Sequence, residues 1–407
     1  MTKQLQLRRG TTAEHSTFTG AVGEITIDTD KDVVVVHDGS TVGGKPTQTA
    51  LVSGTNIKTV NSTSLLGSGN IEVSANTSTF LPTSYYDQSA LITGSQTTLN
   101  IPNVMAYVNT TFVNIASVAI NINDTTYWDN STYATATNRA GKDFYVYALS
   151  NGTIKLSINS TYPTGSDANN SRKIGGFHCL CVNVGTISGH TLTGYTAGMI
   201  LPLSVWDLFN RSSAGNEGMV KNFTGEWVDI YLPSWNGSKL VSVYGGTIAD
   251  GVSSPAFHCY KFEQLFGVIG KTPVSQEEFV VASLGSNQGT NVTGSTDKGT
   301  TGGWTDTAGR RMISNIGCED MCGLMWQWCR DKGGVMTSAA WANAYDGNDS
   351  GVAGQHYQAP YRGLLGGSWH YGAACGSRGS AWGDSPLALA SNCSSRGRAE
   401  PSKNKLI

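Results

Sequence analysis

Apolar and polar residues alternate over short stretches along most of this chain. Near the start, the segments 4–7, 24–27 and 33–36 alternate or are rich in β-branched residues, and Gly20 and Gly39 separate them as turns. These segments are predicted to be strands. About fifty residues of short strand bury too little apolar surface to be stable alone. We therefore expect residues 1–50 to associate with identical copies of themselves.

The clearest alternating pattern lies in the middle of the chain. Residues 144–150 and 153–158 alternate on either side of Asn151-Gly152, which is the dipeptide that two-residue hairpin turns favour. A hairpin with an aromatic and β-branched face needs a second sheet to cover that face. We therefore expect residues 77–208 to form a β-sandwich.

Helical signals occur only in the last part of the chain. Ser275 and Glu278 have capping-box spacing, and the apolar run 279–284 follows directly. Long loops rich in Gly, Ser and Trp come after it, and loops of that length usually carry function. The fold class predicted is mainly β, with an α+β region from residue 209 to 407.

Composition and charge narrow the class of protein. Charged residues make up 14% of the 407, below the roughly 25% of ordinary soluble domains, and there are 50 glycines. The net charge of −2 offers no bulk attraction to nucleic acid or to an anionic membrane. No apolar run is long enough to span a bilayer, and the start lacks the apolar region of a signal peptide. We expect synthesis in a host cytoplasm, with neither membrane insertion nor nucleic-acid binding.

Eight cysteines occur, and none forms a Cys-x-x-Cys pair. A zinc ribbon or thioredoxin-type site is therefore not expected, and buried free thiols are the favoured interpretation. The disulfide state of Cys375 and Cys393 stays open at this point. We expect neither a metal nor a cofactor.

The C-terminal segment 366–398 carries two sets of positions that we expect to face outward. Glycines and tryptophans frame a loop that leaves 370–374 and 381–384 accessible. In 387–392 a period of two predicts a strand with Leu387 and Leu389 in the core and Ala388, Ala390 and Asn392 outside. An ordinary surface strand beside a Gly-rich loop is the alternative.

Several segments spread along the chain resemble one family. Residues 7–15, 172–178 and 364–369 are similar to the major tropism determinants, and the last match continues without a gap through Ser395-Arg-Gly397. These are the receptor-binding tail-fibre proteins of phages that carry a diversity-generating retroelement. Residues 53–71 depart from that pattern and are similar instead to a stalk segment common in phage tail fibres.

The resemblance implies an intertwined homotrimer placed at the tail-fibre tip of a virion. Its parts would be a β-prism-like trimerisation or virion-attachment module at 1–50, a stalk-like segment at 51–76, a β-sandwich at 77–208 and a C-type lectin fold at 209–407, with a variable region at about 366–398. The implied partners are a host cell-surface receptor, protein or glycan, and other tail-fibre proteins.

The resemblance also transfers site residues one position at a time. The positions matching diversified, receptor-binding ones are Ser368, His370, Tyr371, Gly372, Ala374, Ala381, Gly383, Asp384, Ala388, Ala390 and Asn392. The positions matching the constant framework are Trp369, Gly376, Arg378, Trp382 and Arg396. Few of the diversified side chains are larger than a methyl group, so we hypothesise weak binding at each site and a gain from avidity.

Two other functions share this type of fold. Formylglycine-generating oxidases resemble segment 323–328, but they need a close cysteine pair, and Cys375 and Cys393 are far apart in sequence. A calcium-dependent sugar-binding lectin would use Trp382-Gly-Asp384, where Gly383 replaces the ligand Asn. The loop 346–351 begins like an EF-hand, but Tyr357 stands where the bidentate Glu belongs. Neither a nucleophile elbow nor a phosphate loop is present, so an enzyme is not expected. A purely structural fibre protein remains a further alternative.

Overall fold

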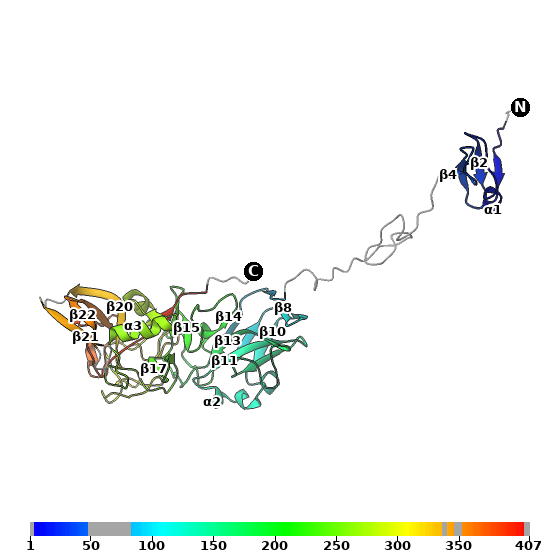
Figure 1. Cartoon of the computed structure of the whole chain (residues 1–407). Coiled ribbons are helices and arrows are strands. Elements are labelled where there is room, and N and C mark those ends of the chain that lie inside the picture. Colours follow the sequence, from blue (N-terminus) through cyan, green and yellow to red (C-terminus); the bar gives the residue numbers. More distant parts are fainter. Residues whose placement is uncertain (1–3, 48–82, 336–339, 346–351, 403–407) are drawn as a thin grey trace. The chain divides into compact units, whose positions relative to one another are not determined.

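The computed structural model describes residues 4–47, 83–335, 340–345 and 352–402. The chain divides into two compact units, Met1–Phe80 and Leu81–Ile407, which are described separately. Figure 1 shows the elements of both units. The predicted stalk at 51–76 and the EF-hand-like loop at 346–351 lie outside the described residues.

The first unit is one four-stranded sheet with a short helix. Its order is β1-β2-β3-β4, and β1 pairs in parallel with β2 while the other pairs are antiparallel. The elements are β1 (Arg8–Gly10), α1 (Thr12–His15), β2 (Ile25–Asp28), β3 (Val33–Val36) and β4 (Lys45–Pro46).

The strands expected at 24–27 and 33–36 are confirmed, and the strand expected at 4–7 is wrong. Pairing begins one residue later, where Arg8 is opposite Thr26. Leu5, in the misassigned stretch, is 88% exposed. A strand needs a partner as well as an alternating pattern, and in the described structure β2 offers one only from Arg8 onward.

Residues 83–208 form small antiparallel sheets around one core. The sheet orders are β5-β8-β9, β10-β7-β6 and β12-β11-β13-β14. The strands are β5 (Tyr86–Gln88), β6 (Thr93–Ser95), β7 (Thr98–Ile101), β8 (Val104–Val108), β9 (Thr111–Ile115), β10 (Val118–Asn121), β11 (Asp143–Leu149), β12 (Ile154–Ser157), β13 (Ser171–His178) and β14 (Trp206–Asp207). The short helices are η2 (Thr125–Tyr127), η3 (Ser131–Ala134), α2 (Ala136–Arg139) and η4 (Pro202–Ser204).

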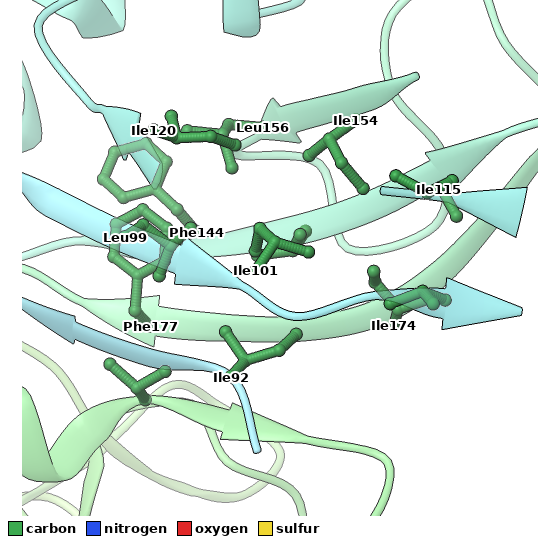
Figure 2. Close-up of a cluster of buried hydrophobic side chains, with 14 of the residues drawn as sticks. Ile92, Leu99, Ile101, Ile115, Ile120, Phe144, Ile154, Leu156, Ile174 and Phe177 are labelled. Carbon is green, nitrogen blue, oxygen red and sulfur yellow. The ribbon is translucent and has the colours of Figure 1, made fainter. Parts of the chain in front are cut away.

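The predicted hairpin is confirmed as β11 and β12. Ala148 is opposite Ile154, and Gly152 adopts a φ of +80° in the turn. A residue with a Cβ is strained at that φ, which is why Asn-Gly marked the turn so clearly. Figure 2 shows Phe144 and Leu156 in the core that this hairpin covers, together with Leu99 and Phe177 from other strands.

Residues 209–402 combine short strands with the two longest described helices. The helices are α3 (Cys259–Val268), α4 (Gln276–Ala282) and the short η5 (Gly372–Ala374). The strands are β15 (Met219–Lys221), β16 (Trp227–Asp229), β17 (Pro233–Trp235), β18 (Leu240–Ser242), β19 (Thr272–Pro273), β20 (Trp326–Val335), β21 (Trp341–Tyr345), β22 (Val352–Tyr357), β23 (Pro360–Leu365), β24 (Ser380–Asp384), β25 (Cys393–Ser395) and β26 (Gly397–Ala399).

The predicted capping box at α4 is confirmed in both of its bonds. The Glu278 amide donates to Ser275 Oγ at 3.2 Å, and the Ser275 amide donates to Glu278 Oε2 at 2.7 Å. None of the helices in the described ranges is long and apolar enough to cross a membrane.

Two sheets of this region hold the C-terminal segment. One has the order β24-β23-β20-β25, with β20 and β25 parallel, and the other has the order β15-β16-β26-β19. The segment from β23 to β26 therefore passes through both sheets. Hydrogen bonds of the buried His178 also join this region to residues 83–208, because His178 contacts Asp143 Oδ1 at 2.8 Å and Tyr231 Oη at 3.0 Å.

Candidate binding surface

The segment 366–392 leaves one sheet strand and returns to the same sheet. It follows β23, forms a loop that contains η5, continues through β24 and turns back into β25. Because both ends are sheet strands, the loop between them is held at fixed points. Such a loop can present side chains without itself contributing to the core.

Two adjacent glycines begin the loop for a steric reason. Gly366 and Gly367 have φ values of +87° and +81°. A Cβ on Gly366 would lie 2.4 Å from Met321 O, and one on Gly367 would lie 2.6 Å from Cys375 Sγ. No other residue type fits at either position without displacement. The loop geometry is therefore fixed at its start.

Arg396 anchors the other end of the segment. Its side chain is fully buried and donates to Gln327 Oε1 at 2.9 Å. Its Nη atoms donate to the carbonyl oxygens of Asp229 and Ile230, both at 2.8 Å, and of Glu319 at 2.7 Å. Burial lowers the pKa of this guanidinium from its ordinary value. Arg396 thus ties three separate backbone segments together, which suits its predicted framework role.

The other predicted framework residues differ in burial. Gly376 is buried, and a Cβ there would lie 2.6 Å from Gln288 Oε1. Trp369 and Trp382 are half-buried and pack against two different apolar clusters. Arg378 is exposed, so burial does not separate it from the predicted variable positions.

Most predicted variable positions reach solvent in the described structure. The exposed ones are His370, Tyr371, Ala374 and Gly383. The half-buried ones are Gly372, Ala381, Asp384, Ala388, Ala390 and Asn392. Burial raises the pKa of the Asp384 carboxyl above its ordinary value. These positions come from the loop, from β24 and from the turn before β25.

Ser368 does not lie on the surface, so the expectation that it faces solvent is wrong. Its side chain has no exposed area. It accepts a hydrogen bond from Asn392 Nδ2 at 3.3 Å, and its carbonyl oxygen lies 3.4 Å from Cys375 Sγ. The loop turns inward at Gly366 and Gly367, and Ser368 follows this turn.

The predicted strand at 387–392 is also wrong, and its expected alternation of buried and exposed side chains is absent. Residues 386–387 and 391–392 are turns, and β25 begins only at Cys393. Leu389 is 40% exposed, whereas Ala388 and Ala390 are half-buried against an apolar cluster. The loop at Gly251 lies directly against this stretch: its amide donates to Ala390 O at 3.1 Å, and a Cβ on Gly251 would lie 2.1 Å from Ala390 N.

An aromatic row lies at the most accessible part of the loop. The ring centroids of Trp369 and His370 are 4.4 Å apart, and those of His370 and Tyr371 are 4.5 Å apart. Trp326, at the start of β20, meets Tyr371 edge to face with centroids 5.3 Å apart. Sequence reasoning did not assign Trp326 to this surface, although the motif 323–328 contains it. Trp326 is only 7% exposed, so it packs against the Tyr371 ring and adds little accessible area of its own.

The thiols near this surface are free and buried. Burial raises the pKa of Cys375 to about 11 and that of Cys393 to about 12, so both are protonated at neutral pH. A protonated, buried thiol is a poor nucleophile and a poor metal ligand. The described residues also contain no group of three or more His, Cys, Asp or Glu side chains placed to hold a metal ion.

Comparisons with known proteins agree along the whole chain. A family model for the major tropism determinant N-terminal domain matches residues 5–41, and one for the Mtd second domain matches residues 95–207. The tail fiber receptor-binding protein of Bordetella phage BPP-1 is 31% identical over 411 residues, which cover 95% of each chain.

Solved structures also match this chain over nearly its whole length. The U1 and I1 variants of the major tropism determinant are each 29% identical, with TM-scores of 0.62 and 0.63 over 98% of this chain and 99% of theirs. The predicted fold class, mainly β with a C-terminal C-type lectin fold, is therefore confirmed. With a relative more than 30% identical over nearly all of both chains, this chain belongs to the major tropism determinant family.

Proposed function

We propose that this chain is the receptor-binding protein at the tip of a phage tail fibre, and that segment 370–384 binds a host cell-surface receptor. The observation that carries the proposal is a run of exposed side chains on a loop fixed at both ends by buried residues. The similarity to a tail fiber receptor-binding protein over 95% of the chain supports it. A rigid loop with replaceable side chains can change its partner without changing its fold.

The proposal includes the division of the chain into four parts. Residues 1–50 form the trimerisation or virion-attachment module, 51–76 the stalk, 77–208 the sandwich and 209–407 the receptor-binding domain. The family models, which match 5–41 and 95–207, lie inside the first and third parts. Residues 366–398 are then the variable region of the fourth part.

A homotrimer is the proposed assembly, with other tail-fibre proteins as further partners. Three apolar side chains of the first unit support it, since Leu5, Val22 and Val42 are 88%, 82% and 58% exposed. A four-stranded sheet of this size cannot cover them itself, whereas copies of the same sheet can. The virion is the proposed location of the assembly.

Binding without catalysis is the proposed activity. The segment 366–392 supplies aromatic rings, small side chains and one carboxyl, and its thiols are buried. Such a surface suits recognition, where a few aromatic residues usually supply most of the binding energy.

Alanine changes at His370 and Tyr371 test the receptor surface. The purified protein and the double variant are compared for binding to susceptible host cells, with Phe223→Ala as the control because Phe223 is 59% exposed outside the segment. We expect the double variant to lose binding at least tenfold and the control to keep it. Unchanged binding by the double variant would contradict the proposal. Light scattering on the same samples checks for a trimer, and a stable monomer would contradict the proposed assembly.

A further inference from the structure

The hairpin of β21 and β22 carries an exposed aromatic pair outside the variable region. Figure 1 shows these two strands at the end of the second unit that lies away from the sandwich strands. Trp341 is 68% exposed and Tyr357 is 45% exposed. The two residues are opposite each other across the strands, and their ring centroids are 5.6 Å apart at an angle of 52°.

The next pair on the same face of the hairpin consists of two amides. Asn343 is opposite Gln355, and Gln355 Nε2 donates to Asn343 Oδ1 at 2.8 Å. Side chains two residues apart on a strand share a face, so the aromatic pair and the amide pair are neighbours. Strands β21 and β22 contain no Lys, Arg, Asp or Glu. One face of the hairpin thus combines open aromatic rings with uncharged hydrogen-bonding groups.

The opposite face of the hairpin is turned toward the body of the domain. Ala344 and Ala353 line a pocket of about 390 Å³ together with Tyr260 and Lys261 of α3 and with Leu387. His356, opposite Ala342, lies on this side of the hairpin and is half-buried, whereas Trp341, Asn343, Gln355 and Tyr357 on the other side are all exposed.

We propose that the outward face of this hairpin is a second binding site, that its ligand is a neutral oligosaccharide, and that binding needs no metal ion. A sugar ring has an apolar face of C–H groups, which stacks on an open indole or phenol ring. Its hydroxyl groups at the ring edge both donate and accept hydrogen bonds, as do carboxamides. An uncharged ligand also matches strands that carry no Lys, Arg, Asp or Glu.

A second copy of this chain is a poorer occupant of the same face. A stable subunit contact buries roughly 800 Å² on each partner. Two aromatic side chains supply about 150–250 Å² each, and the neighbouring groups on this face are polar amides. Taken alone, this face therefore supplies less apolar area than a subunit interface buries, whereas its area matches one or two sugar rings.

Titration calorimetry on the full chain tests the proposal with three neutral probes: maltohexaose, cellopentaose and the pentamer of N-acetylglucosamine. We expect at least one to bind in the presence of a chelator. Trp341→Ala should weaken that binding at least tenfold, and the double change Asn343→Ala and Gln355→Ala should weaken it several-fold. Trp341→Tyr, which keeps a ring, should restore part of the affinity.

Two control variants separate binding at this hairpin from binding elsewhere on the protein. Phe223→Ala removes an aromatic residue of similar exposure outside the hairpin, and the His370 and Tyr371 double variant removes the proposed receptor surface. Both should bind the probe as the unchanged protein does. The proposal is overturned if none of the three probes binds, if Trp341→Ala binds normally, or if Trp341→Ala alters the mass in light scattering, which would make the pair a subunit contact.

Discussion

Gly367 and Gly383 lie in the same segment, but Gly367 is tightly packed and Gly383 has open space around it. A Cβ on Gly367 would collide with Cys375 Sγ, whereas one on Gly383 would meet no atom within 4 Å. The two arginines differ in the same way, since Arg396 is fully buried and Arg378 is exposed. Burial and contact distance therefore mark Gly367 and Arg396 as fixed and Gly383 and Arg378 as accessible, although Arg378 was expected in the framework. A binding protein can change the surface only because the frame does not depend on it.

The largest expected effect comes from Arg396→Met. The change leaves three buried carbonyl oxygens and the Gln327 amide without their donor. We expect the free energy of unfolding to fall by at least ~3 kcal/mol, since each buried unsatisfied group costs about 1–3 kcal/mol. Arg378→Met is the matched control and should change it by less than ~0.5 kcal/mol. Chemical denaturation measures both, and equal effects would remove the distinction between frame and surface.

A smaller effect is expected from Gly367→Ala. The alanine would combine a positive φ with a contact of 2.6 Å to a buried sulfur atom. The expected loss of unfolding free energy is about 2–4 kcal/mol. Gly383→Ala should lie within ~0.5 kcal/mol of the unchanged protein. If thermal unfolding shows the same stability for both variants, the loop is not fixed at Gly367.

The smallest effect is expected from Leu389→Asn, which tests the absence of the expected alternation at 387–392. Leu389 is 40% exposed, so the change should cost less than ~1 kcal/mol. Ala390→Leu should cost more, about 1–3 kcal/mol, because Ala390 is half-buried against an apolar cluster that a larger side chain would overpack. The reverse order in denaturation midpoints would show that the strand predicted from the sequence is the correct one.

Local sequence signals predicted the structure correctly where the interacting residues are close together in the sequence. The Asn151-Gly152 turn needs only its own positive φ, and the capping box at Ser275 and Glu278 closes within one helical turn. The same holds for the glycines that frame the C-terminal loop, because their φ values are local. Placement of the variable positions came from the resemblance to the family, and most of them are at least partly accessible.

Predictions failed where a distant segment decides the outcome. Leu389 and Ala390 have the alternation of a strand, but the Gly251 amide bonds to Ala390 O and β25 begins only at Cys393. Ser368 was expected outside, and the turn at Gly366 and Gly367 directs it inward. The buried Trp326 packs against the exposed Tyr371, a contact between residues far apart in the chain that no local pattern predicted.

The sequence by itself determined the fold class, the hairpin and helix signals, and membership of a family, because composition, turn chemistry and motif order are properties of the chain. The tertiary structure decided which side chains of the C-terminal segment face solvent. It also brought Trp341 and Tyr357 together with two amides on one hairpin face, and it left Cys375 and Cys393, whose disulfide state the sequence did not decide, as free thiols. These outcomes depend on side chains and backbone from distant segments competing for the same space, which no local pattern records.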